Sequence, residues 1–183
     1  MKNKAYDLSS YSFSPDEQIL VDTNIWLYLF PAPNNPSNNF ASQYSNAFSN
    51  LISAKSQPIL DPIILSEYLN RYTRIEWEGN YKNQYPEYKN FRNSPDFSSV
   101  ASTAKIFAKK ILNFCQIHSI PANELDLYQA LADFLNGNID FNDAILVDIC
   151  KKKNLKLMTN DSDFQDGGIE VLTTNRKLLR ACP

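Results

Sequence analysis

The amino-acid sequence predicts a single α/β domain, residues 1–183, built around a mostly parallel sheet. Short apolar runs typical of buried strands recur along the chain, and segments with helical spacing of apolar residues separate them. Helices that alternate with strands favour a parallel sheet with helices on its faces. The length of 183 residues and the 43% hydrophobic content suit one domain with its own core, and they exclude the disordered and fibrous classes.

The first third of the chain contains one predicted strand and one predicted helix. Residues 1–17 are polar and are interpreted as an N-terminal extension. The apolar run ILV, residues 19–21, is typical of a buried strand and ends at Asp22. A loop rich in Pro and Asn covers residues 31–39, and the apolar spacing of residues 40–54 then predicts a helix.

The middle of the chain combines clear elements with one segment that fits no pattern. The run at residues 58–60 predicts a second strand, and Pro62 suits the first turn of a helix that Asp61 caps. Residues 79–97 are rich in Asn, Tyr and Pro, so we expect an insertion or long loop there. The apolar spacing after this segment predicts a helix over residues 98–117, with Val100, Ile106, Phe107, Ile111 and Phe114 as buried residues.

The last third of the chain returns to alternating elements. We expect Asn123 to cap one helix and either Asp140 or Asn142 to cap the next. The apolar runs at residues 155–159 and 168–173 predict two further strands.

Charge and cysteine content limit the possible partners and location. The net charge of −2 means that nucleic acid would have to bind through a local patch or through metal ions. The three scattered cysteines indicate reduced thiols, and no signal peptide or run of about 18 apolar residues is visible, so we expect a cytoplasmic protein without a membrane anchor. The single histidine, His118, disfavours a His-rich zinc site and is expected to be structural.

Five acidic residues stand at the ends of predicted elements. Asp22, Asp161 and Asp163 follow strands, whereas Glu67 lies one turn into a helix and Asp143 lies in the first turn of another. The carboxyl ends of parallel strands meet at one edge of a sheet, so these acids can converge there. Clustered carboxylates raise one another's pKa unless a cation neutralises them. Because no soft ligand lies nearby, Mg²⁺ or Mn²⁺ is the expected cation.

Three motifs in order resemble those of a known nuclease family. ILVDTN, PIILSEYLNR and FNDAILVDICKKKNLKLMTNDSDF are similar to the successive motifs of the PIN-domain nucleases, over about residues 18–173. The resemblance implies a PIN-like fold, with a central mostly parallel sheet flanked by helices. It also implies functional residues, namely the metal ligands Asp22, Glu67, Asp143 and Asp161, a supporting acid at Asp163, and the orienting polar residues Asn24 and Thr159.

The resemblance further implies an activity and partners. We expect a Mg²⁺- or Mn²⁺-dependent ribonuclease that hydrolyses phosphodiester bonds of single-stranded or loop RNA. It is similar to VapC-type toxins, which implies an antitoxin protein as a partner, and a homodimer is a further expectation. The segments 1–17 and 79–97 are additions to the typical small toxin of this family.

Two other functions remain open from the sequence. A PIN-like fold can serve as a binding or scaffold module without catalysis, although the presence of all four acids argues against it. Phosphatases of the haloacid-dehalogenase type also place an Asp after the first strand, but they use D-x-D there, and this chain has Asp22-Thr23-Asn24.

The segment from residue 81 to residue 97 is a tentative RNA-binding surface. Rings can stack on bases while cations meet phosphates, which is a common way to hold a single strand. The same ring spacing fits one helix face packed on the domain or on a second subunit, so both interpretations stay open. The residues concerned are the rings of Tyr81, Tyr85, Tyr88 and Phe91 and the cations Lys82, Lys89 and Arg92.

Overall fold

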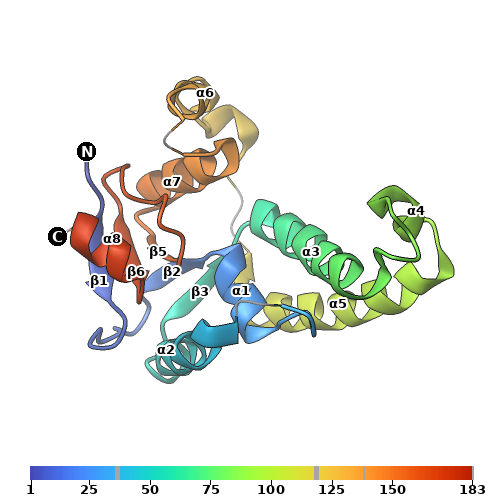
Figure 1. Cartoon of the computed structure of the whole chain (residues 1–183). Coiled ribbons are helices and arrows are strands. Elements are labelled where there is room, and N and C mark those ends of the chain that lie inside the picture. Colours follow the sequence, from blue (N-terminus) through green and yellow to red (C-terminus); the bar gives the residue numbers. More distant parts are fainter. Residues whose placement is uncertain (36–37, 118–119, 138, 183) are drawn as a thin grey trace.

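The computed structural model describes residues 1–35, 38–117, 120–137 and 139–182, and His118 lies outside this part. It confirms the predicted α/β class (Figure 1). The six strands pair in parallel in the order β1-β6-β5-β2-β3-β4. They are β1 (Lys4–Asp7), β2 (Gln18–Val21), β3 (Gln57–Leu60), β4 (Gln116–Ile117), β5 (Lys156–Met158) and β6 (Glu170–Thr173).

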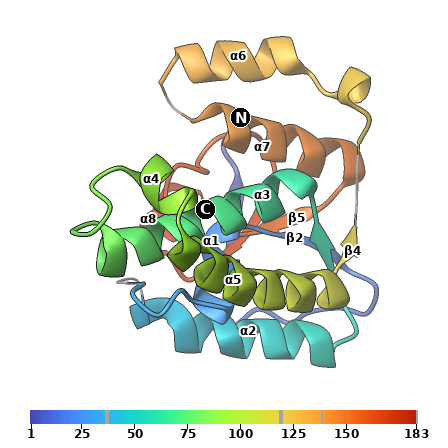
Figure 2. The ribbon, with the colours of Figure 1, turned by 90° about the vertical axis from the view of Figure 1, so that its right-hand side faces the viewer.

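Helices cover both faces of the sheet. α7 lies over one face, α1 and α2 lie on the other, and α3 and α5 extend away together with α4 at their far end (Figures 1 and 2). Three short helical turns, η1 (Asn38–Phe40), η2 (Trp77–Tyr81, a π-helix) and η3 (Ala122–Glu124), complete the set. The α-helices are α1 (Thr23–Leu29), α2 (Ala41–Ser53), α3 (Pro62–Glu76), α4 (Tyr88–Arg92), α5 (Pro95–Phe114), α6 (Leu127–Leu135), α7 (Phe141–Lys153) and α8 (Arg176–Ala181).

The two central strands place the ends of two motifs side by side. Ile19 and Leu20 of β2 and Leu157 of β5 are fully buried, as expected for strands with helices on both faces. Val21 pairs with Met158, the last residues of these strands. The residues that follow each strand, beginning at Asp22 and at Thr159, therefore emerge at the same edge of the sheet.

The prediction of an extension over residues 1–17 is wrong for residues 4–7. These residues form β1, which pairs with β6 at the edge of the sheet, and the Lys4 amide donates to the Ile169 carbonyl at 2.9 Å. Asn3 is buried and bonds the carbonyl of Phe164. An edge strand needs no apolar run, and its partner lies far away in sequence, so local patterns give no sign of β1.

The segment 79–97 is folded, and the expectation of a long loop there is corrected. It contains the end of η2, all of α4 and the start of α5. Phe91 is fully buried at its centre, so the segment has a small aromatic core of its own. The rings around Phe91 belong to Tyr81, Tyr85, Tyr88 and Phe97, with centroid separations from 4.8 to 6.1 Å.

The helix predicted over residues 98–117 begins earlier and ends earlier than expected. Pro95 opens α5, and Gln116–Ile117 form β4 at the sheet edge instead of a last helical turn. Ile106 and Phe114 are exposed rather than buried. Small residues at other positions of the helix, such as Ala104, take their place against the core because α3 packs closely there.

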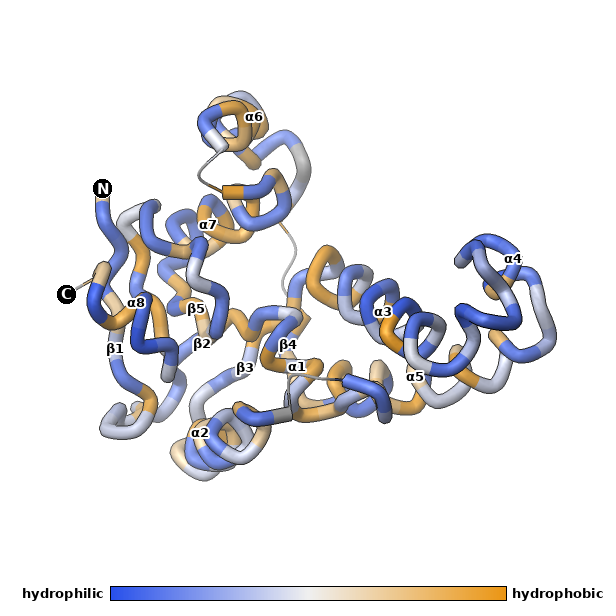
Figure 3. The backbone as a smooth tube through the Cα atoms, viewed as in Figure 1, coloured by the Kyte–Doolittle hydropathy of each residue, from blue (hydrophilic) through white to orange (hydrophobic). Residues whose placement is uncertain are grey.

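Two capping predictions are resolved by the structure. Asp126 caps α6, with its side chain accepting from the Gln129 amide, whereas Asn123 lies in η3. Asp140 caps α7, which decides between the two candidates at that helix. Although α6 is strongly apolar (Figure 3), within it only Ala130 is buried. In the described part of the chain, no helix combines the length and the apolar character needed to cross a membrane.

Candidate active site

Asp22 is a buried carboxylate at the end of β2. Only 5% of the residue is exposed, and the carboxylate accepts hydrogen bonds from the Thr23 amide at 2.6 Å and the Thr159 hydroxyl at 2.6 Å. Burial raises the pKa of Asp22 to about 6, and the carboxylates of Glu67 and Asp161 add to this, against the hydrogen bond from Thr159. A carboxylate in this position is costly to ionise without a cation.

The polar frame around Asp22 comes from α1 and from the segment after β5. The Asn24 amide donates both to Asp22 and, at 3.1 Å, to the Thr159 hydroxyl. The Asn24 carbonyl oxygen in turn accepts from the Asn160 amide at 3.1 Å. Asn24 and Thr159 thus lie where orienting residues are needed, although their functional role stays a prediction.

Glu67 reaches the same edge from α3. Its carboxylate accepts from the Thr23 hydroxyl at 3.1 Å and forms an ion pair with Arg71 at 3.3 Å. The Thr23 hydroxyl also lies 3.3 Å from the Ile64 carbonyl, which ties the start of α1 to the start of α3. The helix that Asp61 and Pro62 begin therefore carries Glu67 to the end of β2.

Asp143 faces this site from the first turn of α7. Burial raises the pKa of Asp143 to about 8, followed in effect by the carboxylates of Asp140, Asp22, Asp161 and Glu67. The Asp143 amide donates to the Asp140 side chain at 3.0 Å, which fixes the first turn. The four predicted ligands therefore share one electrostatic environment, although they come from the end of β2, from α3, from α7 and from the segment after β5.

Asp161 and Asp163 occupy different positions in the turn after β5. The Asp161 amide donates to the Thr159 hydroxyl at 3.0 Å, and its carboxylate accepts from the Asp163 amide at 3.0 Å. The Asp163 side chain is exposed and lines a separate pocket of about 510 Å³ with Val147 and Lys151. Its predicted role near the metal is not supported by any contact with Asp22 or Asp143 and stays a prediction.

The donor chemistry of these residues fits a hard divalent cation. The four acids offer only oxygen ligands, and the raised pKa values of Asp22 and Asp143 indicate carboxylates that lack a compensating charge. Within the described residues, however, no three Asp, Glu, Cys or His side chains lie close enough together to hold a metal ion. The structure therefore shows a shared acidic environment and not a closed ligand shell.

The tentative RNA-binding surface has its cations exposed but its rings turned inward. Lys82, Lys89 and Arg92 are exposed, and the Lys82 ammonium lies 5.4 Å from the ring of Trp77. The rings expected to stack on bases pack around Phe91 instead, which favours the packing interpretation for them. The cations keep their proposed role as a prediction.

Sequence reasoning did not single out three residues that shape this site. Thr23 joins Asp22 to Glu67, and its place within VDTN is the only signal in the sequence. Arg71 pairs with Glu67, which the spacing of four residues on a helix could have indicated. Asn160 accepts from Tyr44 at 2.9 Å and donates to the Tyr28 hydroxyl at 3.0 Å, contacts that no local pattern reveals.

The chain is an α/β protein with an open parallel sheet. Its polar, acidic site lies beyond the carboxyl ends of the strands, which is where proteins of this class bind their ligands. The PIN domain family matches residues 19–170, so the chain belongs to the PIN domain family, a family of nucleases. Comparison with curated proteins finds no match.

Two solved structures resemble the chain in fold. VapBC2 from Rickettsia felis, crystallised with a DNA fragment from its promoter, matches with a TM-score of 0.53 and 19% identity, covering 85% of this chain and 98% of that one. PAE2754 from Pyrobaculum aerophilum matches with a TM-score of 0.46 and 15% identity, covering 91% of this chain and 96% of that one. At this identity, the first match supports the fold alone.

Proposed function

We propose that the chain is a nuclease that requires Mg²⁺ or Mn²⁺ and hydrolyses phosphodiester bonds in single-stranded or loop RNA. The observation that carries this proposal is the buried Asp22, which shares one edge of the sheet with Glu67, Asp143 and Asp161. A folded chain tolerates such a group of acids when a cation is available to bind there. Family membership supports the nuclease activity.

The residues of the chain would divide the work as follows. Asp22, Glu67, Asp143 and Asp161 would hold the cation, and Asn24 and Thr159 would keep Asp22 in a fixed orientation through their hydrogen bonds. A bound divalent ion would lower the pKa of water and neutralise charge on the leaving oxygen. Thr23 would hold Glu67 in place from the other side.

Cleavage assays on single-stranded RNA test this proposal. Activity should require Mg²⁺ or Mn²⁺ and disappear in excess EDTA. Asp161→Asn should lower kcat by about a hundredfold or more, because loss of a residue that only orients a metal ligand already costs about 10- to 100-fold. Asp161 is better suited than the more buried Asp22, because Asp22→Asn disturbs three hydrogen bonds and risks the fold. Glu124→Gln in η3 removes one exposed charge and is the control. Cleavage that persists in EDTA, or full activity of Asp161→Asn, would overturn the assignment.

We also propose that the nuclease is the toxin of a toxin–antitoxin pair. The support is the resemblance to VapBC2, a toxin–antitoxin complex, together with the motifs of VapC-type proteins. A small DNA-binding antitoxin would be the partner, and a homodimer is the expected assembly. Expression of the chain alone should stop growth, Asp161→Asn should restore it, and co-expression of the protein encoded by the neighbouring gene should restore it as well.

A binding or scaffold role without catalysis is the second candidate. A scaffold has no need for a divalent ion, so titration of Mn²⁺ separates the two functions directly. Binding of Mn²⁺ that Asp143→Ala weakens supports the nuclease. The absence of Mn²⁺ binding, in a protein that still binds RNA, supports the scaffold.

A further inference from the structure

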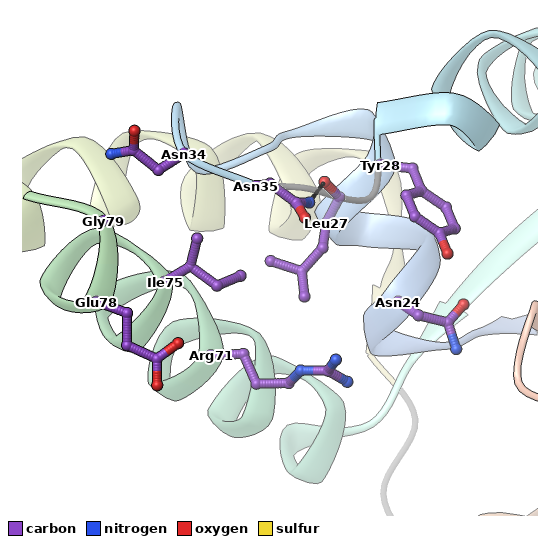
Figure 4. A pocket seen from close by; sticks show the side chains of 9 residues that line it. All are labelled: Asn24, Leu27, Tyr28, Asn34, Asn35, Arg71, Ile75, Glu78 and Gly79. Carbon is purple, nitrogen blue, oxygen red and sulfur yellow. Dashed lines mark hydrogen bonds between the residues drawn. The ribbon is translucent and has the colours of Figure 1, made fainter.

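A pocket of about 390 Å³ adjoins the acidic site (Figure 4). It lies between α1, the segment after it and the end of α3, and two of its lining residues also belong to the acidic site. Asn24 donates to Asp22, and Arg71 pairs with Glu67 at 3.3 Å. If a polymeric ligand places its backbone at the carboxylates, the next monomer of that ligand therefore lies at this pocket.

The far wall of the pocket is built from buried contacts. Glu76 is only 6% exposed, and its carboxylate accepts from the Asn34 amide at 3.2 Å and from the Asn80 side chain at 3.2 Å. At Gly79 the chains approach so closely that a Cβ atom would lie 2.7 Å from the Asn34 Cβ. The buried carboxylate and the glycine hold the segment at Asn34 against η2, and π-helical turns such as η2 are frequent at functional sites.

The chemistry changes in order along the pocket. Figure 4 shows the Arg71 guanidinium extending toward Asn24, the side chains of Leu27 and Ile75 in the middle, and the Glu78 carboxylate at the other end. No ion pair between Arg71 and Glu78 occurs in the described structure, whose salt bridge at Arg71 goes to Glu67. A cation, an apolar surface and a carboxylate acceptor thus follow one another away from the acids.

A nucleotide presents the complementary groups in the same order. Its phosphate suits the guanidinium of Arg71, and its flat base suits the apolar surface of Leu27 and Ile75. The outer edge of the base must then offer donors to Glu78, because an ionised carboxylate only accepts hydrogen bonds. Guanine alone among the four bases carries two adjacent donors, N1–H and the N2 amino group, that can meet both oxygens of one carboxylate.

We propose that this pocket binds the nucleotide that flanks the scissile bond and selects guanine through Glu78. This inference rests on the proposed function, since it assigns the substrate position next to the proposed active site. Arg71 then holds the phosphate between the acidic site and the pocket, and Glu78 sets the base preference.

Binding of nucleoside 5′-monophosphates tests the pocket without cleavage, because these ligands contain no phosphodiester bond. Calorimetry in Mg²⁺ should show that GMP binds the full chain about tenfold more tightly than AMP, CMP or UMP, the scale of one bidentate contact to a base. Glu78→Gln should remove this preference, and Ile75→Trp, which fills the middle of the pocket, should weaken binding of all four. Glu124→Gln, at an exposed glutamate in η3, should behave as wild type.

Cleavage of random-sequence single-stranded RNA supplies the second arm of the test. Wild type should show guanine enrichment at one position beside the cut, and Glu78→Gln should lose it with a raised KM and nearly unchanged kcat. Guanine preference in binding without any cleavage would refute the proposed nuclease and leave the pocket standing. Cleavage without guanine preference, or a preference that survives Glu78→Gln, would refute the pocket and leave the nuclease standing.

Discussion

The pKa values of acidic side chains shift in opposite directions at the two ends of the central sheet. At the carboxyl ends of the strands, burial and neighbouring acids raise the pKa of Asp22 and Asp143. At the amino ends, hydrogen bonds and the charge of Lys156 outweigh burial and lower the pKa values of Glu17 and Glu170. The acids at the carboxyl ends are more deeply buried and have other carboxylates as neighbours, whereas Glu17 and Glu170 are less buried and have a cation beside them, so burial and neighbours together cause the difference.

Lys156 accounts for the behaviour of the amino ends. Its ammonium lies 2.7 Å from Glu17 and 3.2 Å from Glu170, and it also donates to the Tyr11 hydroxyl at 2.7 Å. Burial alone would lower the pKa of Lys156, but these hydrogen bonds have the larger effect, so the pKa is raised above its ordinary value. One lysine on β5 therefore forms ion pairs with two acids within the fold, whereas the proposed divalent cation would compensate the acids at the carboxyl ends.

The largest expected effect is the stabilisation of the fold by a divalent metal ion bound at the carboxyl ends of the strands. Mg²⁺ or Mn²⁺ should stabilise the fold by roughly 2.7 kcal/mol when present at a hundredfold excess over its dissociation constant. This stabilisation raises the melting temperature, and Asp143→Ala should lose most of that rise. Without metal, Asp143→Asn should be no less stable than wild type, because it removes a carboxyl group whose ionisation is disfavoured by burial and by the neighbouring acids. An equal metal-induced shift in wild type and Asp143→Ala would remove Asp143 from the site.

The next largest effect is the loss of stability when Lys156, the cation at the amino ends of the strands, is replaced. Lys156→Met should destabilise the fold by about 1 kcal/mol at neutral pH, because it removes the cationic partner of two acids that keep hydrogen bonds to tyrosines and access to water. Urea unfolding measures the change, with Lys109→Met on the exposed face of α5 as the control. A Lys156→Met protein as stable as the control would show that the acids at the amino ends need no cationic partner.

A pH series sharpens the same comparison. Because the folded-state pKa values of Glu17 and Glu170 are lowered, their stabilising contribution is present above the ordinary glutamate value of 4.5 and is lost as pH falls through the folded pKa. Because the folded-state pKa of Lys156 is raised, the stability that Lys156 contributes is fully present below its ordinary pKa of 10.5 and is lost only as pH rises through the folded-state pKa. The stability difference between wild type and Lys156→Met should thus be constant between these values and shrink in acid. A difference that grows in acid would contradict this account.

The smallest expected effect concerns the exposed cations of the α4 region. Replacing Lys82, Lys89 and Arg92 by Ala in the Asp161→Asn background should weaken RNA binding. The log–log slope of affinity against salt should flatten by about 0.7 for each phosphate that the protein no longer neutralises. Stability should change little, because the rings around Phe91 remain packed. An unchanged slope with a lower melting temperature would assign these residues to packing alone.

The sequence predicted the carboxyl ends of the sheet better than the amino ends, for a physical reason. The acids at the carboxyl ends follow strands or begin helices, and such positions leave a local signal, as at Asp22 and Asp143. The contacts of Lys156 join residues far apart in the chain, and neither Glu17 nor Glu170 stands in a recognisable motif. The same limit explains why β1 and the aromatic core around Phe91 were missed, since each depends on partners that only the folded chain brings together.

The pairing of β1 with β6 determines the order in which the protein can fold during synthesis. Residues 4–7 leave the ribosome early, but their partner strand begins only at Glu170, so β1 must wait for most of the chain. Until β1 docks, β6 has an unpaired edge that can associate with other chains. Asp161 also emerges late, so a nascent chain lacks the complete set of acids. Cleavage that needs all four acids, as proposed, therefore has to await synthesis of the chain beyond Asp161.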